Sequence, residues 1–127
     1  MKSYIASGLM LLTGIAIGAT AIQGLHAQAK PPTYVVVAIR KINDAATYKT
    51  EVIDKAGPVI AAAGGRFVVR TDKITSFDGT PPQRFALIAF DSPEKAQAWH
   101  DSDATKAIDA VRIKTTDSLS FMVEGAQ

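Results

Sequence analysis

Two short runs that are apolar on both faces limit the possible folds more than any other feature of this sequence. Residues 34–40 read YVVVAIR, and residues 84–90 read RFALIAF. Side chains alternate between the two faces of a strand, so a strand with one solvent face shows a polar residue at every second position. Neither run does so. We therefore expect both to be strands that are covered on both sides.

Signals for helix and strand alternate after the first run. Apolar residues at helical spacing predict an amphipathic helix over 45–63, with Asp44 as its N-cap. Gly57-Pro58 lies inside this helix and is expected to kink or break it, because proline lacks an N–H. Gly64-Gly65 is expected to supply a left-handed C-terminal cap. Residues 66–71 follow as the second strand.

The second half of the chain repeats the alternation. Residues 77–82 (FDGTPP) predict a loop, since Asp-Gly favours a turn and proline cannot pair in a ladder. Ser92 is expected to cap a helix that begins at the next residue, a proline. This helix is expected to break at 100–103, where Asp103 can cap another helix. Residues 119–124 predict the last strand.

The resulting order, strand–helix–strand–strand–helix–strand, is that of the ferredoxin-like split βαβ motif. We therefore predict an α+β fold, βαββαβ, with a four-stranded antiparallel sheet and both helices on one face. The other sheet face also needs a cover, because two of its strands are apolar on both sides. A homodimer in which two open sheet faces pack together would provide that cover, and it would help so small a domain bury enough surface.

The first 29 residues have the pattern of a targeting segment rather than of part of the folded domain. Lys2 is their only charged residue, 5–19 is apolar and rich in small residues, and Ala27-Gln28-Ala29 has the small-x-small pattern of a cleavage site. We expect residues 1–29 to be a signal peptide and 30–127 to be the domain, exported to the periplasm or the extracellular space. The alternative is an uncleaved membrane anchor, which is the only membrane contact expected.

Composition excludes several kinds of site. The chain has no cysteine, so disulfides, thiolate catalysis and zinc–thiolate centres are excluded. A net charge of +2 without a basic run gives no case for nucleic acid. We interpret the cluster of His100, Asp101 and Asp103 as residues that interact with a helix end rather than as metal ligands. The sequence has no nucleotide-binding, phosphate-loop or haem-attachment motif. We expect no metal and no cofactor.

Four arginines are candidates for binding an anion. Arg66 and Arg70 are four residues apart, so the period of two places them on one face of their strand. Each can grip a carboxylate or phosphate with two N–H groups, although pairing with nearby acids on a solvated surface is an alternative. Arg84 and Arg112 carry the same two interpretations. Convergence of three of these side chains on one cleft would favour an anionic ligand.

Four other residues are candidates for a pocket. His100 is the one group of the expected domain that titrates near neutral pH; it can act as a general base or simply sit at a helix end. Trp99 can form a pocket wall or pack in the core. The Tyr48 hydroxyl can donate to a ligand or to water. Ser102 can contact a ligand or cap a turn.

Together these residues resemble the family known as domain of unknown function 1330, in the dimeric α+β barrel superfamily. The resemblance covers essentially all of 30–127, and it implies the dimeric barrel fold. Where this family often carries a tyrosine after the Trp-x-x-Ser piece, Ala104 and Thr105 stand instead. The pieces that carry the resemblance are Tyr34, Tyr48, Gly64-Gly65-Arg66, Arg70, Asp78-Gly79, Arg84, Phe90-x-Ser92, Ala96-x-x-Trp99-x-x-Ser102, Arg112 and Glu124-Gly125.

We therefore expect a small exported dimer that binds a small organic molecule in a pocket between helices and sheet; an organic acid is one such molecule, and it becomes the favoured one if three of the arginines converge on the pocket. One alternative is a non-catalytic structural or interaction module, because no activated nucleophile or cofactor motif is visible. Another is a cofactor-free isomerase or monooxygenase-like enzyme, which rests on analogy with the wider superfamily alone. Whether the protein is an enzyme stays open at this stage.

Overall fold

The four predicted strands form one antiparallel sheet in the order β2-β3-β1-β4. The structure is a computed structural model, and it describes residues 30–127. Its strands are β1 (Thr33–Ile42), β2 (Arg66–Thr71), β3 (Arg84–Phe90) and β4 (Thr116–Glu124). With β1 and β3 at the centre and a helical segment in each βαβ half, this is the ferredoxin-like α+β fold. The predicted fold class is confirmed.

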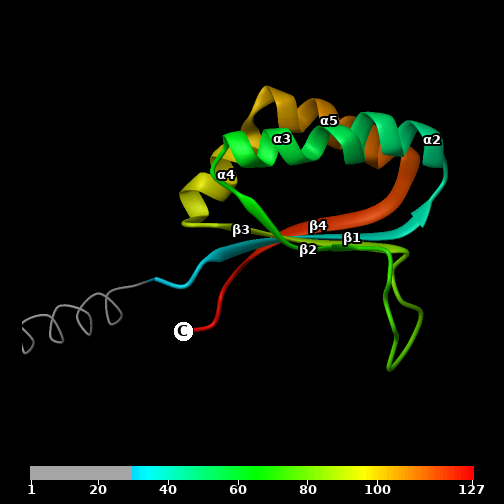
Figure 1. Ribbon diagram of the computed structural model, residues 1–127, viewed down its shortest axis with the longest axis horizontal. Coiled ribbons are helices and arrows are strands. Elements are labelled where there is room, and N and C mark those ends of the chain that lie inside the picture. Colours follow the sequence, from blue (N-terminus) through cyan, green and yellow to red (C-terminus); the bar gives the residue numbers. More distant parts are fainter. Residues whose placement is uncertain (1–29) are drawn as a thin grey trace, which may run out of the picture. The chain divides into compact units, whose positions relative to one another are not determined.

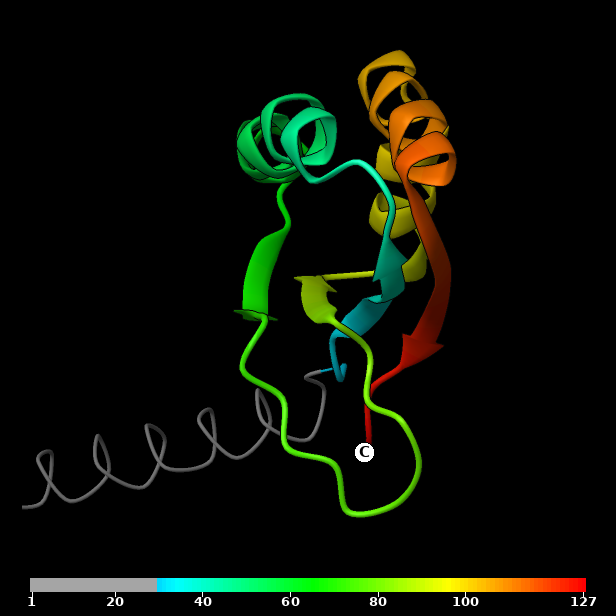
Figure 2. The ribbon, with the colours of Figure 1, turned by 90° about the vertical axis from the view of Figure 1, so that its right-hand side faces the viewer.

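The helices cover one face of that sheet. The first helical segment consists of α2 (Ala45–Tyr48), a π-helical turn η1 (Lys49–Ile53) and α3 (Asp54–Ala62); the second consists of α4 (Pro93–Asp101) and α5 (Asp103–Thr115). Figure 1 shows all of them on the same side of the sheet, and Figure 2 shows the two segments side by side above it. Within the described part of the chain, no helix combines the length and apolar character needed to cross a membrane.

The first helix starts as predicted but does not break where predicted. Asp44 is its N-cap, and an Asp44 carboxylate oxygen accepts from the backbone N–H of Thr47 at 3.2 Å. The prediction of a break at Gly57-Pro58 is wrong, because α3 continues through both residues. The irregularity of this segment lies earlier, in the π turn η1.

Gly64 and Gly65 end this helix for two different reasons. Gly64 has φ +83°, the left-handed conformation predicted for the cap. The N–H of Gly65 bonds the carbonyl of Ile60 at 2.9 Å, and that of Gly64 bonds Ala61 at 3.0 Å, which completes a Schellman motif. At Gly65 a Cβ would lie 2.7 Å from the Phe90 ring, so close packing of the helix end on β3 requires glycine there.

Serines cap both helices of the second segment. The Ser92 hydroxyl accepts from the backbone N–H of Lys95 at 3.2 Å, as predicted. The expectation that Asp103 caps the next helix is wrong: Ser102 has the extended backbone of an N-cap, and its hydroxyl accepts from the N–H of Thr105 at 3.3 Å. Asp103 is already the first residue of α5. The last strand also begins earlier than predicted, at Thr116.

A bulge in β2 separates two arginines that the period of two places together. Arg66 lies opposite Ala89 of β3, whereas Arg70 lies opposite Ala86, three residues away and therefore on the other face. The register shifts between Phe67 and Val69, where one extra residue changes the alternation. The prediction that Arg66 and Arg70 share a face is wrong. Arg70 faces the helices, and Arg66 does not.

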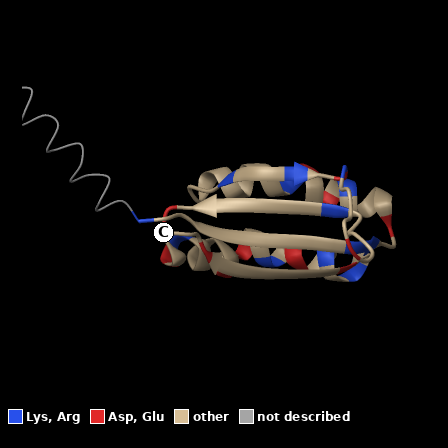
Figure 3. Ribbon diagram, turned by 90° about the horizontal axis from the view of Figure 1, so that it is seen from below, with Lys and Arg blue, Asp and Glu red and all other residues tan. Residues whose placement is uncertain are grey.

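The two faces of the sheet differ in what covers them. On the helix face, two groups of buried side chains form the core, one around Phe90, Ile88 and Trp99 and one around Ile39 and Tyr48. The open face carries an apolar set of side chains from β1, β3 and β4, and Figure 3 shows few charged residues on it away from its edges. By strand pairing, this set is Tyr34, Val36, Ala38, Phe85, Leu87, Ala89, Leu119, Phe121 and Val123.

The predicted signal peptide, residues 1–29, lies outside the described residues, as does its cleavage site. Pro31–Gln127 forms one compact unit.

Candidate functional site

An inner cavity lies between the two helical segments and the sheet. Its floor comes from β1, β2 and β3, its sides come from α2, η1, α3 and α5, and Trp99 of α4 closes one end. Its volume is about 70 Å³. Most of its wall is apolar, and six of the lining side chains carry a hydroxyl, guanidinium or carboxylate group. The lining residues are Val37, Tyr48, Val52, Ile53, Ala56, Val59, Ile60, Phe67, Arg70, Arg84, Ala86, Ile88, Trp99, Thr105, Ile108, Asp109 and Arg112.

Arg70 reaches this cavity because of the bulge in β2. Its guanidinium lies over the Phe67 ring, with Cζ 4.6 Å from the ring centroid. One Nη2–H donates to the backbone carbonyl of Ile53, at the end of η1, at 2.7 Å. The stacked ring and this single acceptor hold the side chain in place and leave its other N–H groups for a ligand.

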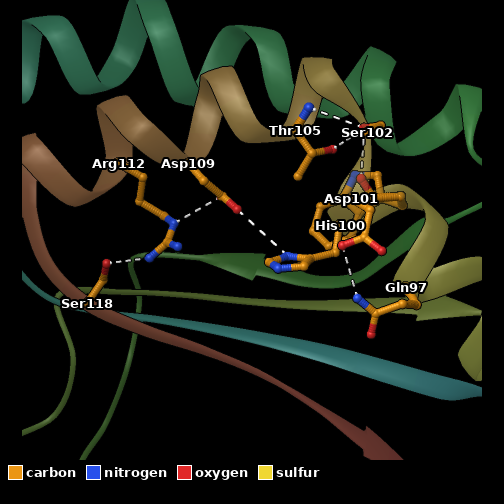
Figure 4. Close-up of polar contacts among 9 residues, drawn as sticks. Gln97, His100, Asp101, Ser102, Thr105, Asp109, Arg112 and Ser118 are labelled. Atoms are coloured by element: carbon orange, nitrogen blue, oxygen red, sulfur yellow. Dashed lines mark hydrogen bonds and ion pairs between the residues drawn. The ribbon is translucent and has the colours of Figure 1, made fainter.

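Arg84 and Arg112 enter from the strand and the helix on either side. Arg84 lies opposite Ile39 in the sheet, and Ile39 is a core residue, so the pair shares the helix face. Arg112 lies in the last turn of α5, and its side chain is only 11% exposed. Its Nε–H donates to Asp109 at 3.3 Å, and its Nη1–H donates to the hydroxyl of Ser118 at 2.7 Å (Figure 4).

Tyr48 lies among these three arginines. Its side chain is buried, and burial raises the pKa of the phenol above its ordinary value. The positive charges of Arg84, Arg112 and Arg70 oppose this increase in the pKa without cancelling it. The hydroxyl therefore keeps its proton at neutral pH and remains a hydrogen-bond donor.

The charges around the inner cavity do not balance. Asp109 is the one carboxylate among the lining residues, against three guanidinium groups. Within residues 30–127, Arg112 is paired with Asp109, whereas neither Arg70 nor Arg84 has a carboxylate within ion-pair distance. An excess of positive charge in a largely apolar cavity favours an anion. Sequence reasoning missed Asp109, although its i, i+3 spacing from Arg112 on a predicted helix was a usable signal.

An outer pocket of about 420 Å³ lies between α4, α5 and β4. His100, in the last turn of α4, lines it and does not line the inner cavity. Its side chain is 60% exposed, and Nδ1 lies 3.9 Å from the Asp109 carboxylate, as Figure 4 shows. Trp99 and Arg112 line both spaces and so form the wall between them.

Besides His100, two predicted site residues do not line the inner cavity. Arg66 is exposed and lines neither space. Ser102 caps α5, and its hydroxyl donates to the Trp99 carbonyl at 2.8 Å. The structure thus brings Tyr48, Arg70, Arg84, Trp99 and Arg112 to one cavity and leaves His100, Arg66 and Ser102 out of it. No group of three or more potential metal ligands occurs within residues 30–127.

Trp99 carries a polar atom that needs an acceptor. The side chain belongs to the core, with its ring 5.4 Å from that of Phe90. Its indole Nε1–H is buried and has no hydrogen-bond partner within residues 30–127, and it is the one buried side-chain polar atom in that part of the chain of which this is true. An unpaired buried N–H costs about 1–3 kcal/mol.

Comparison with known proteins places these features in a family. A family model described as Domain of unknown function (DUF1330) matches residues 32–126. No curated protein matches the sequence. Among solved structures, a protein of unknown function from Rhodopseudomonas palustris has a TM-score of 0.62 at 12% identity, covering 85% of this chain and 93% of that chain.

Two further structures have names that suggest an activity. A protein from Caulobacter crescentus, assigned provisionally as an antibiotic biosynthesis monooxygenase, has a TM-score of 0.56 at 16% identity, covering 83% of this chain and 99% of that chain. SnoaB, a cofactor-independent oxygenase from Streptomyces nogalater, has a TM-score of 0.54 at 12% identity, covering 76% and 95%. At these identities the likeness shows the fold alone.

Proposed function

This chain belongs to the DUF1330 family, and we propose that it is an exported, homodimeric domain that binds a small organic anion in the inner cavity. The observation that carries the proposal is the convergence of Arg70, Arg84 and Arg112, with the protonated hydroxyl of Tyr48, on one largely apolar space. A structural or interaction module does not require this convergence, whereas a bound anion would complement Arg70 and Arg84, which have no carboxylate within ion-pair distance in residues 30–127.

The chemistry of the lining residues indicates what kind of anion would bind. Guanidinium groups and a phenolic O–H suit a carboxylate or another oxyanion. The remaining lining, including Val37, Ile60 and Ile88, is hydrocarbon and suits an apolar body. A small carboxylic acid therefore matches the cavity better than a sugar or a bare inorganic anion.

Replacing Arg70 by alanine is expected to weaken binding of such an acid by about 10- to 100-fold, the loss that follows when one charge-assisted hydrogen bond is removed. Ligands would first be found by a thermal-shift screen of small carboxylates, phenols and phosphates, and affinities would then be measured by titration calorimetry. Arg66→Ala is the matched control, because it removes the same charge from the other face of the same strand.

The control should bind like the wild type. Equal weakening in Arg66→Ala would mean that only the net charge matters, and the inner cavity would lose its assignment. A wild type that binds no member of the panel would contradict the proposal directly. Because Arg70 also bonds the Ile53 carbonyl, the unfolding of each variant without ligand is measured separately.

A second candidate function, cofactor-free catalysis, is favoured by one contact. Asp109 lines the inner cavity and has the imidazole of His100 3.9 Å away on its other side, which places a titratable pair beside the proposed ligand. Turnover of a ligand found in the screen, with loss of the rate but not of the affinity in His100→Ala, would favour an isomerase or monooxygenase-like enzyme. Binding without turnover would favour a carrier.

Dimerisation through the open sheet face is the assembly part of the proposal. It is supported by the apolar set on that face, where Phe121 is 47% exposed and Val123 is 40% exposed. Large side chains of this kind, gathered on one sheet face, are typical of an interface rather than of a solvated surface.

Export is the localisation part of the proposal, and it rests on Lys2, the apolar stretch 5–19 and the Ala27-Gln28-Ala29 pattern. If a signal peptidase cleaves there, the intact mass of the protein recovered outside the cytoplasm will be that of residues 30–127. Recovery of the uncut chain in the membrane fraction would favour the anchor instead.

A further inference from the structure

The buried indole of Trp99 indicates a second contact to the ligand. The residue is 9% exposed, and its Nε1–H lacks an acceptor within residues 30–127. Tryptophan N–H groups usually find a partner when they are buried. The end of α4 is fixed, since both the N–H and the hydroxyl of Ser102 donate to the Trp99 carbonyl. Trp99, a residue that lines the inner cavity, therefore has a fixed backbone and an indole N–H without a partner in residues 30–127.

The strand register and the core packing place the Trp99 ring toward the opposite end of the inner cavity from Arg84. Trp99 packs in the core group that contains Ile88 and Phe90, whereas Tyr48 packs in the other group. Along β3, Arg84 and Ile88 are four residues apart, which is about 13 Å of strand. The inner cavity thus has Tyr48 and Arg84 toward one end and Trp99 toward the other, with a largely apolar wall between them.

We propose that the ligand is an apolar acid with a second hydrogen-bond acceptor at its far end, such as a hydroxyaromatic or an oxo acid, and that Trp99 Nε1–H donates to this acceptor. The inference rests on the proposed function, because the arginines must hold the acid group for the far end to reach the indole. The long side chains of Arg84 and Trp99 span much of the distance, so a single ring or a short chain is sufficient between the two polar groups.

Matched ligands test the second contact directly. 4-Hydroxybenzoate and 4-methylbenzoate have the same shape and the same carboxylate, but only the hydroxyl can accept from an indole N–H. 4-Oxopentanoate and pentanoate form an aliphatic pair with the same contrast. In each pair the compound with the acceptor is expected to bind the full-length protein about tenfold more tightly, the value of one hydrogen bond.

The single tryptophan of the chain gives a second readout. Trp99 is the one tryptophan of the sequence, so the ¹⁵N-labelled protein has one indole N–H resonance. This resonance should move downfield with 4-hydroxybenzoate and much less with 4-methylbenzoate. In Trp99→Phe, which removes the N–H and keeps an aromatic ring, the preference for 4-hydroxybenzoate over 4-methylbenzoate should disappear, whatever happens to the affinity for both.

The outcomes separate this inference from the function on which it rests. If the acids bind and depend on Arg70, but the members of each pair bind equally and the indole resonance responds alike, Trp99 is not a donor to the ligand and water or a partner chain supplies the acceptor. If no acid binds, the proposed function itself fails. Should Trp99→Phe not fold, the wild-type affinities and the indole resonance still decide the question.

Discussion

Replacing Phe121 by aspartate is expected to convert a homodimer into folded monomers. Phe121 of β4 lies opposite Val36 on the open sheet face and is 47% exposed in the single chain. In a face-to-face dimer the new carboxylate would be buried against apolar side chains of the partner. An unpaired buried charge costs several kcal/mol, so the dimer should weaken by at least three orders of magnitude.

Ser120→Asp is the control for this substitution. It introduces the same charge into the same strand one residue away, opposite Val37 and therefore on the helix face. Sedimentation velocity should give a dimer for the wild type and for Ser120→Asp, and a monomer for Phe121→Asp with unchanged circular dichroism. A monomeric wild type, or a dimer that survives Phe121→Asp, would contradict assembly through this face.

Much of the fold was predictable because local signals and burial agree in this chain. The two runs that are apolar on both faces are the central strands β1 and β3. Asp44, Gly64 and Ser92 act as caps where the pattern predicts them, since each cap depends on only a few neighbouring residues. The family resemblance and the observed strand order are consistent with the same fold.

The errors come from interactions that neighbouring residues do not encode. No residue pattern in β2 indicates the extra residue of the bulge. The bulge nevertheless places Arg70 on the helix face of the sheet and Arg66 on the open face. Pro58 would normally disrupt a helix, but α3 continues through it, and the irregular turn of this segment lies several residues earlier, in η1. For the site, periodicity placed Arg66 and Arg70 together, but only Arg70 lines the inner cavity. The position of Asp109 in the cavity wall depends on how α5 packs against the sheet, which its spacing from Arg112 does not give.

Arg112 is the residue on which the stability of the site should depend most. Its side chain is 11% exposed and donates both to Asp109 and to Ser118, and Asp109 is itself only 24% exposed. Arg112→Met would leave the Asp109 carboxylate half-buried, with only the exposed imidazole of His100 nearby. Breaking a buried pair from one side costs about 3–5 kcal/mol, and the partial exposure of Asp109 places the expected loss near 3 kcal/mol.

Urea denaturation at a fixed protein concentration measures this loss, and Arg40→Met is its matched control. Arg40 pairs with Asp117 at 3.2 Å, but both side chains are more than half exposed, so its replacement should cost less than about 1 kcal/mol. Adding Asp109→Asn to Arg112→Met should restore part of the free energy of unfolding, because the second change removes the carboxylate charge that the first change leaves without its arginine partner. Equal losses for Arg40→Met and Arg112→Met, or a double variant no more stable than Arg112→Met, would show that the pair is not what stabilises this wall of the cavity.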